Sequence, residues 1–336
     1  MDRRLVVAAA GGVLIADGGD TRWTTTGGVL DGRPGCALID GRRPDRILIG
    51  SYRGGLVLSE DGGERFEPTG VDEIEPESVT ALAVDPTDPD RLYAGTEPSR
   101  LYISEDGGHR WSAVDGLETV PSADTWSFPP RPDTHHVRWI EPDPNESRRL
   151  YIGIEAGALV VTPDGGESWI DRPSGSRVDN HTMATHPDAP GRVYAAAGDG
   201  YAESTDRGAS WQPVQQGLDH RYVWGLAVDT GDPDTVVVSA ARGATSAHRE
   251  PGESYLYRRT GDTDWCRLDN RGVPTGHGHR RAVLVAGPSP GEFYAATVEG
   301  VYRSTDAGDA WHRLPIEVPE AIQGALPRGL DVCDRP

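Results

Sequence analysis

Histidines gather in one part of the chain. Eight of the ten fall within residues 135–279. Four of them arrive from successive segments of the sequence: His136, His181, His220 and His279. Imidazole binds Zn, Cu, Fe and Ni ions and transfers protons near neutral pH. These four residues are therefore candidate ligands of a divalent metal ion, and His136 and His181 are also candidate catalytic residues.

Charged residues occupy short segments that have the composition of hairpins. They are Arg53, Glu97, Glu155, Asp199, Arg242 and Glu299. Glu155 and Asp199 are candidate general acids or bases. Arginine forks bind carboxylate, sulfate and phosphate groups, which points to an anionic or oxygen-rich ligand. The candidate ligand-binding residues are Arg53, His135, Arg138, His220, Tyr222, Arg242, His279, Arg280 and Arg281.

An internal repeat decides which elements must carry these residues. Five segments share the pattern S/T-x-D-x-G-x-x-W/F: SEDGGERF (59–66), SEDGGHRW (104–111), TPDGGESW (162–169), STDRGASW (204–211) and STDAGDAW (304–311). Two degenerate copies complete a set of seven: ADGGDTRW (16–23) and RTGDTDW (259–265). The units fall near residues 17, 61, 106, 164, 206, 261 and 306, and their mean spacing of about 48 residues is typical of β-propeller blades.

The repeated segment resembles the Asp-box or BNR repeat, which occurs in sialidases, tandem-propeller xyloglucanases, the sortilin ectodomain and the photosystem II assembly factor. The resemblance covers essentially the whole chain. It implies an all-β fold, a single seven-bladed β-propeller domain of four-stranded antiparallel blades over residues 1–336. It implies little about activity, because the family contains both enzymes and proteins that only bind. A typical sialidase is not expected, since the R-I-P motif of sialidases is absent.

The repeated aspartates are expected to be structural. An Asp side chain accepts backbone N–H bonds in a tight turn, glycine supplies the positive φ, and the aromatic ring packs between strands. This interpretation applies to Asp61, Asp106, Asp164, Asp206 and Asp306. It also makes the tryptophans of the repeats core residues and not a platform for sugar binding.

The strands can be read from the repeat. Residues 78–114 form one complete predicted blade, with strands in VTALAVDP, RLYAGT, RLYISEDGG and HRWSAV. Residues 5–16 match the second and third strands of later units, so two strands are expected there instead of a signal peptide. The first blade then lacks its first strand. Residues 326–334 (LPRGLDVCD) are expected to supply it and to close the propeller.

Counting back from the turn prolines aligns the first strands of the blades. One row reads Arg33, Ser78, His136, Asp179, Tyr222, Arg280 and Leu326. The row two residues deeper reads Gly35, Thr80, Arg138, His181, Trp224, Ala282 and Arg328. Strand starts and second hairpins share one edge of an antiparallel blade. We therefore expect His136, Arg138, His181, Tyr222, Arg280 and Glu155 to line one concave site in an axial funnel, with an apolar floor beneath.

Three long segments are expected to enter the same face as lids, because long loops in a compact repeat are often functional. They are residues 115–134, 243–254 and 270–281.

The amino-acid composition limits the kinds of molecule that the protein is expected to bind. The 53 acidic and 33 basic residues give a net charge of -20, which argues against nucleic-acid binding. All basic residues are Arg and none is Lys, which predicts a halophilic, cytoplasmic protein; a GC-rich genome is the alternative explanation. The three cysteines form no CxxC motif and are expected to be buried and inert. No apolar run is long enough for a membrane helix.

Three hypotheses about function follow. The first is a small-ligand site, with a glycosidase-like hydrolase or lyase acting on a carbohydrate or another oxygen-rich anion. The second is a non-catalytic propeller that binds a protein partner during assembly. The third is a metal site formed by the four histidines from successive segments.

Overall fold

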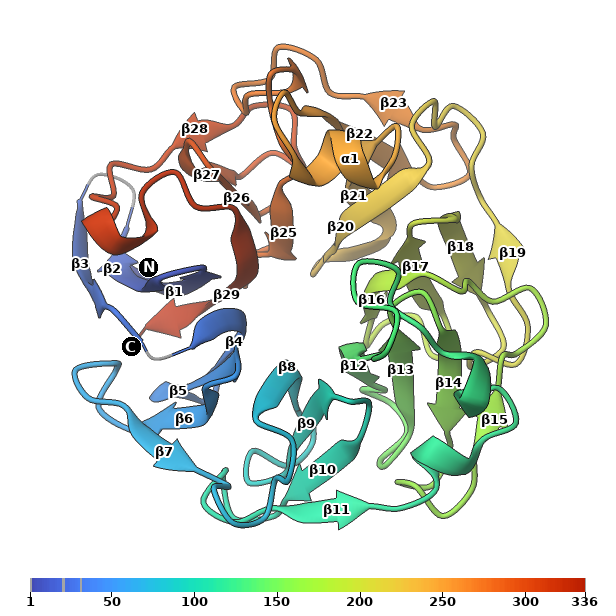
Figure 1. Ribbon diagram of the computed structural model, residues 1–336. Helices are drawn as coiled ribbons and strands as arrows, with labels where there is room; N and C mark the ends of the chain where they lie inside the picture. The colour runs from blue at the N-terminus through green and yellow to red at the C-terminus, as the bar shows by residue number, and fades with distance from the viewer. Residues whose placement is uncertain (1, 20–21, 31, 336) are drawn as a thin grey trace. The chain divides into compact units, whose positions relative to one another are not determined.

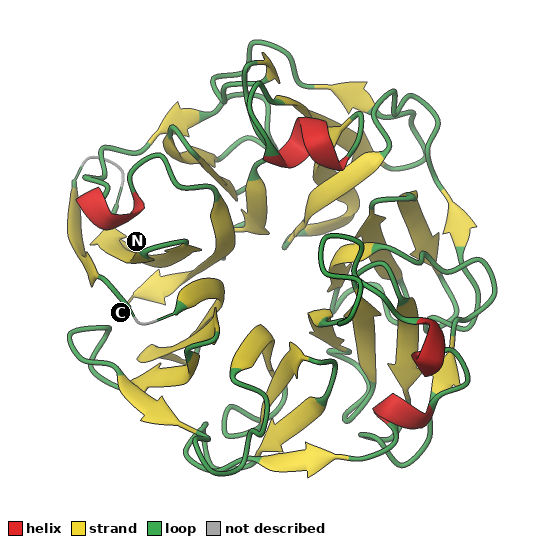
Figure 2. Cartoon of the chain, in the orientation of Figure 1, coloured by secondary structure: helices red, strands yellow, loops and turns green. Residues whose placement is uncertain are grey.

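The computed structural model describes residues 2–19, 22–30 and 32–335. Seven four-stranded antiparallel blades make the chain a seven-bladed β-propeller (Figure 1), which confirms the predicted fold class. One blade carries an additional short strand. Helix within the described residues is limited to α1 and three short 3-10 helices (Figure 2): α1 (Ala244–His248), η1 (Leu117–Thr119), η2 (Ala123–Thr125) and η3 (Glu320–Ile322).

The strands of the first four blades along the chain follow the predicted segmentation. They are β29 (Pro327–Arg335), β1 (Asp2–Ala9), β2 (Gly12–Gly18) and β3 (Trp23–Gly28); β4 (Arg33–Asp40), β5 (Arg43–Tyr52), β6 (Gly55–Ser59) and β7 (Glu67–Thr69); β8 (Ser78–Val84), β9 (Leu92–Glu97), β10 (Leu101–Ser104) and β11 (Ser112–Val114); and β12 (Val137–Pro142), β13 (Leu150–Ile154), β14 (Ala158–Thr162) and β15 (Ile170–Asp171).

The remaining three blades have the same order. They are β16 (Asn180–Thr185), β17 (Val193–Ala197), β18 (Gly200–Ser204) and β19 (Gln212–Pro213); β20 (Tyr222–Asp229), β21 (Asp232–Ala241), β22 (Glu253–Thr260) and β23 (Cys266–Arg267), with β24 (Gly276–His277) paired to β22; and β25 (Val283–Ala286), β26 (Phe293–Thr297), β27 (Gly300–Ser304) and β28 (His312–Arg313).

The two ends of the chain share one blade, as predicted. Strand β29 pairs antiparallel with β1, with Leu5 opposite Val332 and Val7 opposite Leu330. Residues 5–16 lie in β1 and β2 and are therefore strands. Because β29 covers the edge of β1, the first blade has the four strands of the others.

The chain divides into two compact units. One consists of Met1–Ile49, Ser59–Phe66 and Gln215–Pro336, and the other of Gly50–Leu58 and Glu67–Val214. The single domain expected over residues 1–336 stays a prediction.

The five turn aspartates have nearly identical surroundings. In the turn that follows β6, the Asp61 carboxylate accepts the Ser59 hydroxyl at 2.7 Å and the backbone N–H of Arg65 at 3.0 Å. The equivalent hydroxyl and carboxylate bonds recur at Asp106, Asp164, Asp206 and Asp306. These local donors lower the pKa of the Asp61 carboxyl. Residues 20 and 21 of the first degenerate repeat lie outside the described residues.

The tryptophans of the repeats pack inward. Trp23, Trp111, Trp211, Trp265 and Trp311 are buried. Trp169 is half-buried and donates its indole N–H to the carbonyl oxygen of Asp115 at 3.2 Å. These rings form part of the packing between strands and are not available as a sugar-stacking surface.

The cysteine prediction is only partly correct. Cys36 and Cys333 are buried, but Cys266 is exposed at the start of the edge strand β23. Among the described residues, no helix is long and apolar enough to cross a membrane.

Candidate functional site

First strands of several blades carry one extra residue. In β12 the pairing with β13 passes from Val137 directly to Trp139, so Arg138 has no opposite residue. The same irregularity occurs at Thr80, His181, Trp224 and Arg328. All five belong to the deeper row aligned from the sequence. A bulge of this kind kinks the strand and redirects a side chain.

Two of these bulge residues belong to one cluster of ionisable side chains. His136 directly precedes β12, and Glu155 lies in the turn between β13 and β14. The His136 Nε2 atom lies 2.9 Å from Glu155 Oε2, and both side chains are buried. The Arg138 Nε atom lies 3.7 Å from the same carboxylate oxygen. Glu155 therefore has an imidazole and a guanidinium on one side.

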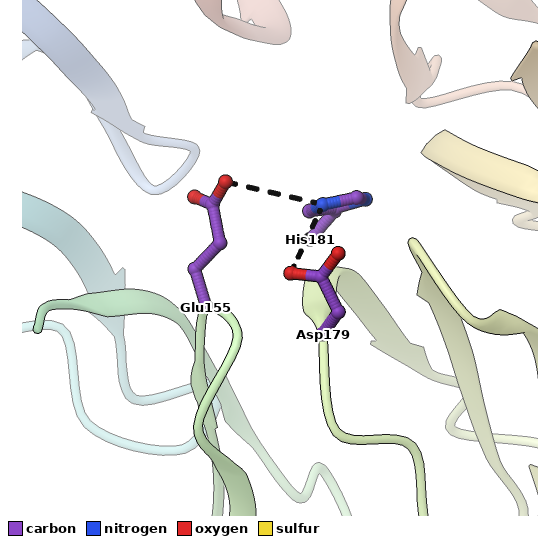
Figure 3. Close-up of side chains that lie close together, drawn as sticks. All are labelled: Glu155, Asp179 and His181. Carbon is purple, nitrogen blue, oxygen red and sulfur yellow. Dashed lines mark ion pairs between the residues drawn. The ribbon is translucent and has the colours of Figure 1, made fainter. Parts of the chain in front are cut away.

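The next blade supplies the other side of the cluster. Asp179 directly precedes β16, and His181 is the second residue of that strand. The His181 Nε2 atom lies 3.6 Å from Asp179 Oδ1 and 4.0 Å from Glu155 Oε1 (Figure 3). The His181 side chain is fully buried, whereas 29% of the Asp179 side chain is exposed. Asp179 is thus the most accessible carboxylate of the cluster.

The backbone holds these side chains in place. The N–H of Ala156 donates to Asp179 Oδ1 at 2.9 Å, which ties the Glu155 turn to the start of β16. The buried Asn180 amide donates to the carbonyl oxygen of Ala158 at 3.1 Å. A Cβ atom at Gly153 would lie 2.9 Å from the Cβ of Asn180, so glycine is required for this close approach of the two blades.

The two carboxyl groups have opposite pKa shifts. Burial raises the pKa of Glu155, but the His136 hydrogen bond and the charges of His136, His181 and Arg138 outweigh burial and lower it to about 2. Burial raises the pKa of Asp179 above its usual range, and His181 only partly offsets the effect. Glu155 is therefore a carboxylate at neutral pH, while Asp179 holds its proton more tightly.

The long segment over residues 115–134 packs against the histidines, which is where the prediction placed a lid. The Phe128 ring meets the His136 ring edge-on at 4.8 Å, and the Trp126 ring meets the His135 ring at 5.5 Å. Arg131 forms an ion pair with Glu97. Burial lowers the pKa of His135, so this histidine is neutral at neutral pH.

Asp199 also lies beside the cluster. Its carboxylate accepts the backbone N–H groups of Val178 and Asp179, each at 3.4 Å, and lies 3.8 Å from the Arg177 guanidinium. Asp199 therefore positions the backbone before β16. Arg53 has an exposed side chain, and its backbone N–H donates to the Ser78 hydroxyl at 3.1 Å.

The other predicted site residues lie in the first unit and have partners there. His220 contacts the Tyr257 hydroxyl and lies 3.9 Å from Glu253, which also lies 3.6 Å from Arg242. Burial lowers the pKa of His220. His279 bonds Glu299 at 2.9 Å.

Tyr222 and Arg281 meet through His248, a residue of α1. Arg281 Nε donates to His248 Nδ1 at 3.2 Å, which makes Nδ1 an acceptor and places the ring proton on Nε2. His248 Nε2 then donates to the Tyr222 hydroxyl at 3.0 Å. Arg281 also lies over the Trp224 ring, 4.1 Å from its centre.

The neighbouring Arg280 has different partners from Arg281. It lies 3.4 Å from Glu250 and donates to the carbonyl oxygen of Gly324.

The structure thus brings together four of the predicted residues, His136, Arg138, Glu155 and His181, and adds Asp179 to them. Sequence reasoning aligned Asp179 in the first row but did not select it. It selected neither Glu253 nor His248 as a site residue, although both lie in the predicted long segment 243–254. Glu253 begins a strand at the end of that segment, and His248 lies in the only α-helix of the described residues, so the blade repeat gave no position for either.

Solved structures share the fold. An ancestral GH74 enzyme matches with a TM-score of 0.67 at 18% identity, over 86% of this chain and 39% of that enzyme. YCF48 from Cyanidioschyzon merolae matches with a TM-score of 0.58 at 14% identity, over 94% of this chain and 88% of that one. YCF48 bound to D1 peptide matches with a TM-score of 0.58 at 15% identity, over 84% of this chain and 83% of that one. At these identities the likeness shows the fold alone.

The chain spans about two fifths of the length of the GH74 enzyme that it resembles. No family model matches the sequence, and no curated protein matches it.

Proposed function

We propose that His136, Arg138, Glu155, Asp179 and His181 form a binding site for a small anionic or oxygen-rich ligand. The observation that carries the proposal is the convergence of these five ionisable groups from two blades, four of them buried. Burying several such groups together is costly unless a ligand, a metal or mutual pairing compensates. The proposal also takes the repeated turns to be Asp-box repeats and the site to lie in an axial funnel.

Arg138 and the two histidines supply the positive side of this site. A guanidinium donates two parallel hydrogen bonds to a carboxylate, phosphate or sulfate group. Asp179 supplies an exposed oxygen that can accept hydrogen bonds from hydroxyl groups of a sugar. The chemistry therefore suits an acidic sugar better than a neutral one.

We propose that any reaction at this site is a hydrolysis or an elimination. One oxygen atom of Glu155 and one of Asp179 lie within 4.8 Å of each other. Retaining glycosidases hold their two carboxyl groups roughly 5 to 5.5 Å apart, so the spacing is compatible with hydrolysis. In an elimination, Arg138 would neutralise the carboxylate of the sugar and a histidine or Glu155 would take the proton from the carbon next to that carboxylate. A carbon–carbon double bond would form as the C–O bond to the leaving group breaks, and the leaving oxygen would gain a proton and depart as a hydroxyl group.

Binding of glucuronate, glucose 6-phosphate and glucose 6-sulfate to the purified protein tests this proposal by saturation-transfer NMR. We expect at least one of these anions to bind, and Arg138→Ala to abolish its signal. Arg280→Ala is the control, because Arg280 contacts Glu250 and Gly324 and not the cluster. Equal binding by wild type and Arg138→Ala would refute the proposal.

A second candidate function is a non-catalytic assembly propeller. It is favoured by the match with YCF48, which extends over nearly the whole length of both chains, whereas the GH74 enzyme is much longer. Affinity purification from the native host tests it. A stoichiometric protein partner whose binding survives Arg138→Ala would put this function first.

We also propose a cellular environment and excluded partners from the composition, and we retain the four-histidine metal site as a prediction. The acidic, Lys-free chain fits a halophilic protein of a high-salt cytoplasm, and nucleic acid and membranes are not expected partners. The metal site of His136, His181, His220 and His279 also stays a prediction. The described partners of His220 are Tyr257 and Glu253, and that of His279 is Glu299.

A further inference from the structure

We propose that Glu155, Asp179 and His181 bind a divalent first-row metal ion, Zn²⁺ or Mn²⁺, which presents the anionic ligand to Arg138. The metal site stands on its own geometry. The role of the ion in ligand binding rests on the proposed function.

One oxygen of Glu155 and one of Asp179 lie near the same ring nitrogen of His181 (Figure 3). His181 Nε2 lies 3.6 Å from Asp179 Oδ1 and 4.0 Å from Glu155 Oε1, and one donor atom of each residue lies within 4.8 Å of the other two. Ligands that each lie about 2.0–2.2 Å from one ion are separated by roughly 3 to 4.4 Å. The two measured separations are too long for direct hydrogen bonds and fall in this range.

Neighbouring groups already orient two of the three ligands. His136 bonds Glu155 Oε2 at 2.9 Å, which leaves Oε1 as the oxygen nearest to His181. The N–H of Ala156 holds Asp179 Oδ1 at 2.9 Å. Residues that hydrogen-bond to ligating carboxylates are a regular part of protein metal sites, because they fix the direction of the ligand.

Burial distinguishes this group from a surface cluster of acidic residues. His181 is fully buried, and Glu155 is nearly so. The Nδ1 atom of the buried His136 has no hydrogen-bond partner among the described residues, and its nearest described carboxylate is Glu97 at 3.7 Å. The cluster thus contains a buried nitrogen atom that the hydrogen bonds among the described residues do not use.

The donor types select the ion. One imidazole and two carboxylate oxygens suit Zn²⁺ or Mn²⁺, whereas Ca²⁺ and Mg²⁺ prefer sites made of oxygen alone. With three protein ligands, the ion keeps at least one coordination position for water or for an oxygen of the ligand. Asp179 is the most exposed of the three, so this open position lies on its side.

Arg138 complements the ion and does not replace it. Its Nε lies 3.7 Å from Glu155 Oε2, the oxygen that His136 binds, and not from the oxygen nearest to His181. In the proposed site, a carboxylate or phosphate bound to the ion also contacts the guanidinium. This arrangement pairs one anion with two cationic groups, the metal ion and Arg138.

Titration of untagged, EDTA-treated protein with Zn²⁺ and with Mn²⁺, by isothermal calorimetry, tests the site. We expect one equivalent of at least one ion to bind. Asp179→Asn and His181→Ala should weaken binding by more than about 100-fold, beyond the ~10- to 100-fold lost when an outer-shell partner is removed. Asp179→Asn preserves size and shape, so it also reports if His181→Ala fails to fold.

His312→Ala is the matched control, because His312 is an exposed histidine of β28 that belongs to no proposed site. Its metal affinity should equal that of wild type. Loss of binding in His279→Ala together with full binding by Asp179→Asn would overturn the inference and favour the four-histidine site. No stoichiometric binding of either ion would also overturn it.

The anionic sugars separate this inference from the proposed function. If the ion binds but none of the three sugars does, with or without metal, the metal site stands and the proposed function fails. If a sugar binds the EDTA-treated protein as tightly as the metal-loaded protein, the proposed function stands and the role of the ion in ligand binding fails.

Discussion

Two histidine-containing clusters are built on first strands of different blades, yet they contain different kinds of side chain. The cluster around Glu155 combines two carboxylates, two histidines and an arginine. The cluster around His248 combines the aromatic rings of Tyr222 and Trp224 with the guanidinium of Arg281. In this second cluster both ring nitrogens of His248 are hydrogen-bonded.

The same backbone device therefore serves two purposes. A bulge places Arg138 and His181 in the first cluster and Trp224 in the second. In the first cluster the bulge residues Arg138 and His181 are ionisable, so the bulges bring together groups that can bind a ligand. In the second cluster the bulge residue is Trp224, whose indole ring packs beside α1 against His248.

The largest effect on stability is expected from Trp224→Ala. The Trp224 ring packs on His248 at 4.4 Å and under Arg281 at 4.1 Å. Its loss should lower the free energy of unfolding by about 3 kcal/mol, the lower end of the range for a buried tryptophan. Urea denaturation measures the change, and metal binding by the folded variant should be normal. A stable variant that no longer binds metal would break the contrast between the clusters.

The converse is expected for His181→Ala and Arg138→Ala. Arg138→Ala should abolish ligand uptake and His181→Ala metal uptake, and each should lower the thermal midpoint less than Trp224→Ala does, because these polar side chains lie at the proposed site and not in the apolar packing. Calorimetry and thermal denaturation of the same samples check this. A lower midpoint with no separate binding defect would show that these residues brace the blades.

Two carboxyl groups sharpen the comparison through pH. Cationic partners lower the pKa of Glu155, whereas desolvation of the half-buried Asp331 raises its pKa to about 6, and the backbone N–H groups of Ile39 and Val332 offset this only in part. The unfolded chain has an Asp pKa near ~3.9, so the folded state binds the extra proton. The contribution of Asp331 to stability is therefore greatest below about pH 4 and falls as pH rises towards 6.

Asp331→Asn should remove this dependence. The difference in thermal midpoint between variant and wild type should move in favour of the variant from pH 4 to pH 7. A constant difference over this range would mean that Asp331 is ionised in the folded protein at pH 4. Val71→Ala serves as the reference variant, because Val71 is exposed and has no ionisable side chain.

A smaller and more general effect is expected from salt. The net charge of -20 makes like charges repel in the folded chain, and salt screens this repulsion. The thermal midpoint should therefore rise between dilute buffer and molar KCl. Equal midpoints would contradict the halophilic interpretation and favour the codon-usage explanation of the missing lysines.

Most of the fold could be predicted, because the patterns that indicate it lie within short stretches of the sequence. The repeated turn, the alternation within Ser78–Val84 and the match of residues 5–16 to later strands were enough to place the blades and the closing strand β29. These features depend on residues close in sequence, since the turn Asp bonds donors within four positions.

The candidate site was harder to predict because its contacts join distant residues. Row alignment found Arg138 and His181 together, since each lies six residues before its turn proline, Pro144 or Pro187. It could not show that Asp179 approaches Glu155 across two blades, which depends on the glycine at position 153 and the Ala156 N–H. His220 and His279 looked equivalent to His181 in sequence, yet local partners, Tyr257 and Glu299, hold them.

An anomalous difference map from crystals grown with one equivalent of Zn²⁺ is the most direct test of the claim that the Glu155 cluster is a binding site. The account predicts one strong peak about 2.0–2.2 Å from Glu155 Oε1, Asp179 Oδ1 and His181 Nε2. A peak beside His220 or His279, or none at all with Glu155 still bonded to His136, would contradict it.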